Sequence, residues 1–74
     1  MEKEGATLLE VENNGEFLVL LDGRKLWVNP GDMPTVCIWI PTAELEISED
    51  EDGGAFPVSV RNLEDDEEIQ AAWV

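Results

Sequence analysis

A chain of 74 residues with 43% hydrophobic side chains can form one globular domain, although a chain this short buries only about 60% of the surface that it exposes when unfolded. Eighteen acidic residues against four basic ones give a net charge of −14, which disfavours direct binding to nucleic acid or to anionic lipid, because both are held mainly through Lys and Arg. A lone cysteine excludes an internal disulfide, and no stretch approaches the roughly 20 apolar residues of a membrane span.

The amino-terminal sequence MEKEGATLLE is acidic and lacks the apolar run of a secretory signal peptide. Together with the unpaired cysteine, it predicts a cytoplasmic protein. We expect a single domain over residues 1–74, in which residues 1–5 are disordered. Cys37 lies in an apolar run, and the chain has no histidine to activate a thiol, so Cys37 is predicted to be a buried small hydrophobic residue.

Turn signals recur at short intervals, and the runs between them are rich in Val, Leu, Ile and Trp. The signals are NNG at 13–15, DG at 22–23, NPGD at 29–32, EDEDGG at 49–54 and EDD at 64–66. Short β-type runs between evenly spaced turns predict an all-β sandwich or barrel.

The first strand is predicted at 6–12, with Thr7, Leu9 and Val11 on one face. The NNG turn then closes a hairpin onto a second strand at 16–21. Because this second strand is apolar on both faces, we expect it to be central in the sheet or covered on its second side.

The third strand is predicted at 24–29, after a two-residue turn formed by Asp22 and Gly23. Type I′ turns of this length need positive φ, which Asp-Gly supplies. Side chains directly opposite each other in such a hairpin share a face. This pairing assigns the following residues to the interior: Phe17, Val19, Leu21, Leu26 and Val28.

The outer face of the same hairpin then carries apolar side chains as well. We expect segment 33–41 to fold over this face as a second small core, because its prolines fix its path and its apolar residues need a partner. If the face is open, it is an apolar patch rimmed with acids, of the kind that marks an interface. The candidate binding patch consists of Leu18, Leu20, Trp27 and Trp39.

The remaining segments complete an all-β chain. Residues 35–40, bounded by two prolines, predict a short strand or a 3₁₀ turn packed across the barrel. Alternating apolar residues predict strands at 43–48 and 55–62. The last segment, 67–74, alternates in the same way, and a strand is preferred there over a helix starting at Asn62. Trp39 and Trp73 are expected to fill the core, because a small barrel needs large side chains there.

With these turns in place, the sequence resembles a group of small uncharacterised bacterial proteins that share an Asp-Gly turn, a following Trp-Val and Pro, and a later Trp-x-Pro element. The resemblance covers about residues 18–73 and implies a small SH3-like antiparallel barrel of five to six short strands, without an established activity. The chain departs from the pattern at Thr42–Glu44, where a Gly-Asp turn is usual. The matching positions are Asp22, Gly23, Trp27, Val28, Pro30, Asp32, Thr35, Trp39, Pro41, Leu45, Ile47 and Asn62.

Catalytic chemistry has little support in this sequence. With no His and no Tyr, Cys37 has no candidate base, and a zinc site of Cys and His ligands is excluded. No cofactor motif is present. Two acidic runs, at 49–52 and 65–68, do not match EF-hand spacing and are interpreted as solvated turns. The weak candidates for a divalent cation are Asp50, Asp52, Asp65 and Asp66.

The sequence therefore predicts a non-catalytic protein-interaction or structural module. Its acidic surface favours another protein with a basic surface as the partner, and self-association through the apolar patch is a close variant. The alternative is an acidic mimic of nucleic acid, or a protein that binds divalent cations.

Overall fold

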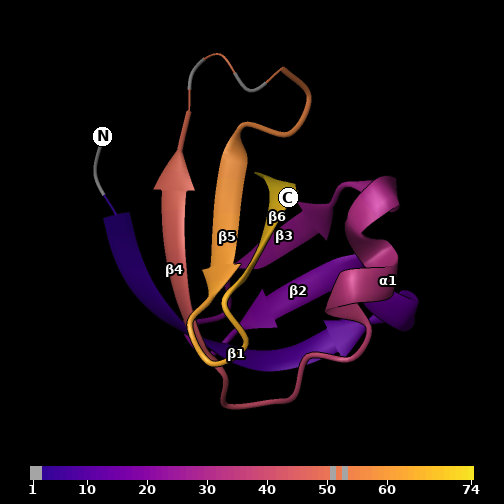
Figure 1. Cartoon of the computed structure of the whole chain (residues 1–74), viewed down its shortest axis with the longest axis vertical. Helices are drawn as coiled ribbons and strands as arrows, with labels where there is room; N and C mark the ends of the chain where they lie inside the picture. Colours follow the sequence, from indigo (N-terminus) through magenta and orange to yellow (C-terminus); the bar gives the residue numbers. More distant parts are fainter. Residues whose placement is uncertain (1–2, 51, 53) are drawn as a thin grey trace.

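The computed structural model describes residues 3–50, 52 and 54–74, and within them the chain forms a closed antiparallel barrel of six strands (Figure 1). The order around the barrel is β1-β2-β3-β6-β5-β4. The predicted small SH3-like barrel is confirmed. No helix in the described part of the chain is long and apolar enough to cross a membrane. The strands are β1 (Lys3–Glu12), β2 (Phe17–Leu20), β3 (Lys25–Val28), β4 (Glu44–Glu49), β5 (Val58–Asn62) and β6 (Glu67–Trp73).

Strand β1 is long because it pairs with two neighbours in succession. Its first half, Lys3–Thr7, pairs with β4, and its second half pairs with β2. The prediction that residues 1–5 are disordered is therefore wrong for residues 3–5, whose backbone lies in the ladder with β4. Met1 and Glu2 lie outside the described residues.

A change of register in β1 corrects the predicted faces of this strand. The pairing with β2 shifts between Leu8 and Glu10, as at a β-bulge, so Leu8 and Val11 both pack on the core. Leu9, predicted to share a face with Val11, is instead exposed. Strict alternation fails here because the extra residue of a bulge reverses the side on which each later side chain lies.

The turn between β2 and β3 contains three residues rather than two. Leu20 N–H donates to Arg24 O at 2.8 Å, and Gly23 N–H donates to Leu20 O at 2.9 Å, so Leu21, Asp22 and Gly23 form the loop. Gly23 has a φ of +96°, as expected at the left-handed position that ends such a loop. The strands then pair Phe17 with Trp27, Leu18 with Leu26, and Val19 with Lys25.

This register exchanges the two faces predicted for β2, whereas Leu26 and Val28 of β3 lie inside as predicted. Leu18, Leu20, Leu26 and Val28 are fully buried, whereas Leu21 is 64% exposed. Phe17 and Val19 are half-buried on the outer face. The predicted interior is therefore wrong for Phe17, Val19 and Leu21, because one extra loop residue moves the pairing by one position and each side chain to the other face. The buried apolar residues of the whole core are Leu8, Leu18, Leu20, Leu26, Val28, Val36, Trp39, Ala43, Leu45, Ile47, Val58, Val60, Ile69 and Ala71.

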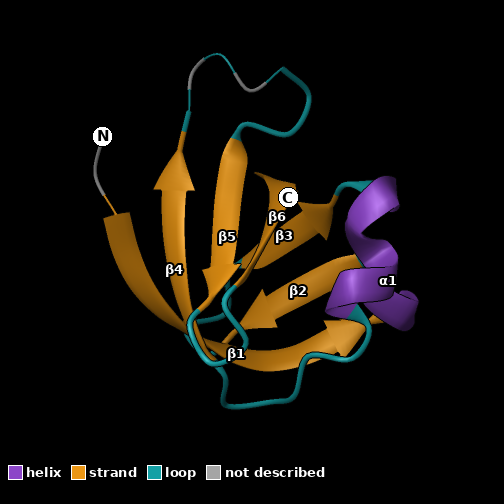
Figure 2. Cartoon of the chain, viewed as in Figure 1, coloured by secondary structure: helices purple, strands orange, loops and turns teal. Residues whose placement is uncertain are grey.

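The segment between β3 and β4 closes one end of the barrel. It contains the 3₁₀ turn η2 (Pro30–Asp32) and the single helical turn α1 (Met33–Val36), which packs against the 3₁₀ turn η1 (Asn13–Gly15). Figure 2 shows these helical elements together at one side of the strands. Val36 and Trp39 are buried in the core. The segment therefore plugs the barrel end. It does not cover the outer face of the hairpin, so the prediction that it covers this face is wrong.

Gly15 allows this close packing. Its φ is +106°, and an added Cβ would lie 2.6 Å from the carbonyl oxygen of Met33. Cys37, at the end of α1, is exposed, and its Sγ donates to the Pro34 carbonyl at 3.2 Å. The prediction of a buried Cys37 is wrong, because the helical turn directs Val36 inward and Cys37 toward solvent.

The last three strands agree with the sequence. Their buried apolar residues alternate as predicted, and the end of the chain is the strand β6 rather than a helix. Strand β5 begins at Val58, just after Pro57, which is later than predicted. Asn62 is buried at its end, and its Oδ1 accepts from the backbone N–H of Glu64 at 2.9 Å, which holds the following turn.

Two single substitutions test the hairpin register. Leu20→Ala should lower the free energy of unfolding by about 2 to 5 kcal/mol, because it leaves a cavity in the core. Leu21→Ala, one residue later on an exposed side chain, should change it by less than about 0.5 kcal/mol. Urea unfolding followed by tryptophan fluorescence measures both values. The reverse order of effects would indicate the two-residue turn and its register.

Candidate functional site

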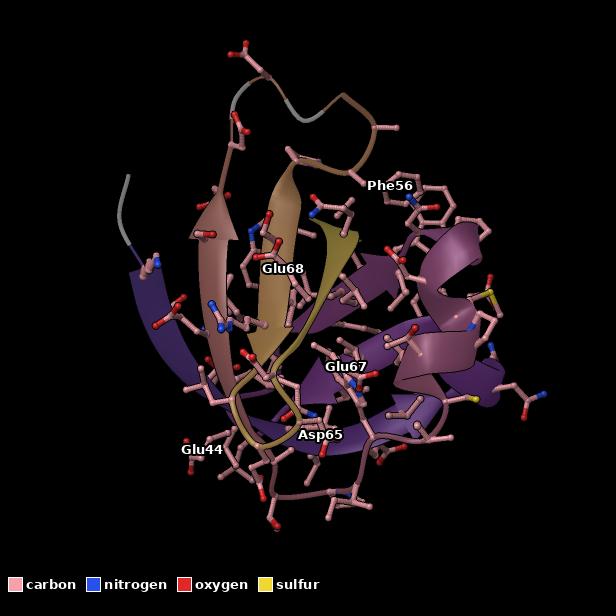
Figure 3. The ribbon with its side chains drawn as sticks, in the orientation of Figure 1. Glu44, Phe56, Asp65, Glu67 and Glu68 are labelled. Atoms are coloured by element: carbon pink, nitrogen blue, oxygen red, sulfur yellow. The ribbon has the colours of Figure 1, made fainter. Side chains whose placement is uncertain are left out.

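The hairpin register places aromatic side chains on the outside of the barrel. Trp27 lies opposite Phe17 in the ladder and is 41% exposed. The ring of Phe56, from the segment before β5, packs against Trp27 with 5.0 Å between ring centroids and 52° between planes. Figure 3 shows Phe56 at the end of the barrel that lies away from Glu44 and Asp65. Two sequence-distant aromatic residues thus meet at the surface.

A shallow depression of about 330 Å³ lies beside Trp27. We call it the aromatic groove. Its wall includes the half-buried carboxylate residue Glu16 and the exposed carboxyl-terminal Val74. Apolar surface with a polar edge is the composition of many protein interfaces. The residues that line the groove are Glu16, Phe17, Trp27, Trp73 and Val74.

Two of the groove's aromatic rings already carry cations from the same chain. Lys25 Nζ lies 4.6 Å from the ring centroid of Phe17 and 2.7 Å from Glu12 Oε1. Arg24 Cζ lies 4.8 Å from the ring of Trp73. Such cation–π contacts contribute about 0.5 to 1 kcal/mol at exposed sites. The described residues place no cation over Trp27 or Phe56.

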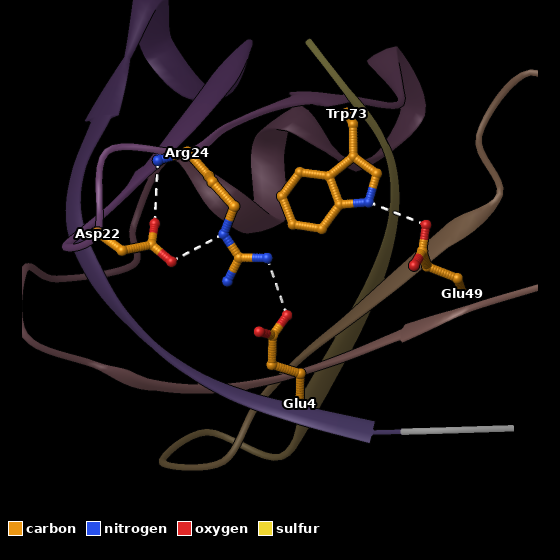
Figure 4. Close-up of polar contacts among 5 residues, drawn as sticks. All are labelled: Glu4, Asp22, Arg24, Glu49 and Trp73. Carbon is orange, nitrogen blue, oxygen red and sulfur yellow. Dashed lines mark hydrogen bonds and ion pairs between the residues drawn. The ribbon is translucent and has the colours of Figure 1, made fainter.

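A polar network closes the barrel end around Arg24 (Figure 4). Arg24 Nε donates to Asp22 Oδ2 at 2.7 Å, and a terminal guanidinium nitrogen donates to Glu4 Oε1 at 2.9 Å. Trp73 Nε1 donates to Glu49 Oε1 at 3.0 Å. Because Glu4 is in β1, Glu49 in β4 and Trp73 in β6, these contacts link strands that are distant in sequence. They also fix Trp73, a wall of the aromatic groove.

The charges in this network shift each other's pKa. The pKa of Asp22 is lowered, first because its carboxylate accepts the backbone N–H of Arg24 and then because of the Arg24 side chain. The pKa of Arg24 is raised, first by its hydrogen bond to Glu4 and then by Asp22. Both groups are therefore held in their charged forms.

Every Lys and Arg in the described chain is engaged in an ion pair. Besides the contacts of Arg24 and Lys25, Lys3 pairs with Glu46, and Arg61 pairs with Asp66. Several acids around the barrel therefore have no cation of the same chain beside them. The surplus of negative charge faces solvent, where its field extends beyond the barrel.

The predicted binding patch is not a surface of this protein. Leu18 and Leu20 are core residues, and Trp39 is buried at the α1 end, where its Nε1 donates to Glu67 Oε1 at 3.0 Å. Trp27 is the member of the patch that is exposed. The prediction correctly placed Trp27 outside but gave it the wrong neighbours. Predicting a turn of three residues would have identified Phe17 as a neighbour of Trp27. The contact between Phe56 and Trp27 joins distant segments and has no local signal in the sequence.

Two of the four weak cation candidates, Asp50 and Asp66, have carboxylates that contact other groups of the described chain. Asp50 Oδ1 accepts from the backbone N–H of Asp52 at 2.9 Å, and Asp66 pairs with Arg61. The backbone N–H of Asp65 donates to the buried Asn62 side chain. Within the described residues no group of three or more His, Cys, Asp or Glu side chains is arranged to hold a metal ion. Glu51, in the same acidic run as Asp50, lies outside the described residues.

The comparisons with known proteins give no match: the sequence fits no family model, and neither the curated proteins nor the solved structures yielded a similar protein. The aromatic groove is therefore interpreted from its own geometry and charge.

Acidification tests the barrel-end network. Because the pKa of Asp22 is lower in the folded protein than its ordinary 3.8, its carboxylate stabilises the fold above that value, and this contribution is lost as the pH falls through the lowered pKa. Asp22→Asn should therefore melt below the wild type near neutral pH, and the difference should shrink below about pH 3. Circular dichroism measures both melting temperatures.

Asp52→Asn provides the control for this comparison, because it removes the same charge from an exposed loop position. This variant corrects for the general relief of repulsion in a chain with a net charge of −14. A difference between Asp22→Asn and Asp52→Asn that is the same at neutral and at acid pH would contradict the role given to Asp22.

Proposed function

We propose that this protein is a non-catalytic binding module that engages another protein with a basic surface through the aromatic groove. The observation that carries the proposal is the exposed Trp27, packed against Phe56 on a barrel with a net charge of −14. Tryptophan is among the residues that contribute most to binding at protein interfaces. An exposed aromatic group on so small a domain is therefore a natural anchor for a partner.

The charge of the chain supports a basic partner. A net charge of −14 attracts a positively charged protein at long range and accelerates the first encounter, with an effect that weakens as salt is added. The Lys and Arg residues of the described chain are already paired with its own acids. Cations from a partner would offset the remaining negative charge.

We propose a non-catalytic role because the chain lacks residue types that catalysis commonly uses. A chain without histidine offers no imidazole base for Cys37, whose thiol contacts a backbone carbonyl. We further propose that the module acts in the cytoplasm, as its free cysteine suggests. We also propose, from the resemblance of the sequence, that this protein is related to small bacterial β-barrel proteins.

A capture experiment tests the binding role. Immobilised wild-type protein should retain a basic partner from a lysate of the source cells at low salt, and Trp27→Ser should lose most of it, because the anchor is removed. Ile38→Ser is the matched control, since Ile38 is also exposed but lies after α1. Quantitative mass spectrometry compares the three eluates.

The same experiment distinguishes the alternatives. A partner that is retained equally by wild type and Trp27→Ser would contradict binding through the aromatic groove. A partner displaced by added DNA, and indifferent to Trp27→Ser, would indicate an acidic mimic of nucleic acid instead. If the retained protein is the chain itself, the groove mediates self-association.

A further inference from the structure

The aromatic groove has a specific relation to positive charge within its own chain. A guanidinium lies over Trp73 at one wall, and an ammonium lies over Phe17 at another. In both cases the cation is also held by a carboxylate, from Glu4 and Asp22 for Arg24 and from Glu12 for Lys25. The recurring unit is an aromatic ring with a cation over its face and a carboxylate paired with that cation.

Trp27 and Glu16 supply the ring and the carboxylate of a third such unit, but the described residues supply no cation for it. Trp27 lies in the same groove as Glu16. Glu16 Oε1 accepts from the Asn13 side chain at 3.2 Å, and the carboxylate forms no ion pair with any residue that the structure describes. Glu16 is half-buried as a residue, and its hydrogen bond to Asn13 lies in an exposed position.

We propose that the aromatic groove binds an arginine side chain of the basic partner, with the guanidinium plane stacked on Trp27 and its N–H groups donating to Glu16. This inference rests on the proposed binding function and names the chemical group that the groove selects. The ring is open to solvent on one side and tilted against Phe56, so the site is a shallow surface rather than an enclosed cage.

Arginine suits this surface better than lysine. A guanidinium is flat, is weakly hydrated, and can stack on an indole while its edge donates to a carboxylate. An ammonium is a compact and strongly hydrated charge that loses more on leaving water. The chain's own use of arginine over Trp73, at the barrel end, shows that an indole of this protein accepts a guanidinium at 4.8 Å.

The three indole N–H groups provide separate NMR reporters of binding. Those of Trp39 and Trp73 donate to Glu67 and Glu49, and Trp39 is buried far from solvent. We would titrate the labelled protein with capped hexa-arginine at physiological ionic strength. The expected result is a saturable shift of the Trp27 indole signal, while the signal of Trp39 stays in place.

Three peptides of equal length distinguish binding of a guanidinium from binding of an ammonium and from binding of a neutral group of the same shape. Hexa-lysine should bind about three- to tenfold more weakly than hexa-arginine, because the ammonium stacks less well. Hexa-citrulline, which keeps the shape of arginine but is neutral, should leave the Trp27 signal unchanged. Equal affinity for the arginine and lysine peptides, or a saturable shift with the citrulline peptide, would overturn the selection of a guanidinium.

Three variants locate the site. Trp27→Leu and Glu16→Gln should each weaken binding of hexa-arginine by about three- to tenfold, as expected for the loss of a stacking contact or of a charged hydrogen bond. Isothermal titration calorimetry measures these affinities, because Trp27→Leu lacks the Trp27 indole reporter. Glu44→Gln removes the same charge at the end of the barrel away from Phe56 (Figure 3) and should have little effect. The unchanged Trp39 indole signal verifies that each variant is folded. Equal weakening by Glu16→Gln and Glu44→Gln would mean general attraction to net charge and would overturn the proposed site.

The outcome is distinguishable from a failure of the binding function itself. If the capture experiment finds a Trp27-dependent partner but hexa-arginine does not shift the Trp27 signal, the protein binds through the groove without selecting arginine. If no Trp27-dependent partner is found while hexa-arginine binds as expected, the arginine site stands and the proposed role of the module fails.

Discussion

The length of the turn between β2 and β3 is the constraint on which the rest of this structure depends. Three loop residues, ending at Gly23 with positive φ, set the register in which Leu18 lies opposite Leu26. Both strands carry apolar side chains on each face, so hydrophobicity alone does not decide which face is buried. The turn decides it. Leu18 and Leu20 enter the core, and Phe17 and Trp27 are left outside to form the aromatic groove.

The two ends of the barrel are closed by different physical means. At one end, the apolar side chains of Val36 and Trp39 are buried in the core. The helical turn that brings them there packs closely on Gly15. At the other, Arg24 is held among carboxylates and stacked on Trp73 (Figure 4). Burial of apolar surface stabilises the plug, and this stabilisation is insensitive to salt. The polar closure is exposed, so salt screens its ion pairs. Trp73 belongs to the polar closure and also to the groove, so the fold positions one wall of the candidate site.

The acidic surface and the aromatic groove act together in the proposed role. Long-range attraction brings a basic partner to the barrel without specifying where it binds. The exposed Trp27, with Phe56 behind it and Glu16 beside it, supplies a local anchor. Selection of a guanidinium requires both, because stacking alone accepts any planar group and charge alone accepts any cation.

The sequence by itself determined the all-β architecture, the strands from Glu44 onward and the placement of Trp27 on the outer face, because alternation and turn residues are local signals. It did not determine the face of β2, since Asp-Gly is compatible with loops of two or three residues and a single residue reverses every side chain. The bulge in β1 belongs to its pairing with β2, and the ordering of residues 3–5 follows from pairing with β4, about forty residues later in the chain. Only the tertiary structure decided that Phe56 packs on Trp27 and that Arg24 stacks on Trp73, because such contacts depend on how distant segments meet in space and leave no periodic pattern in the sequence.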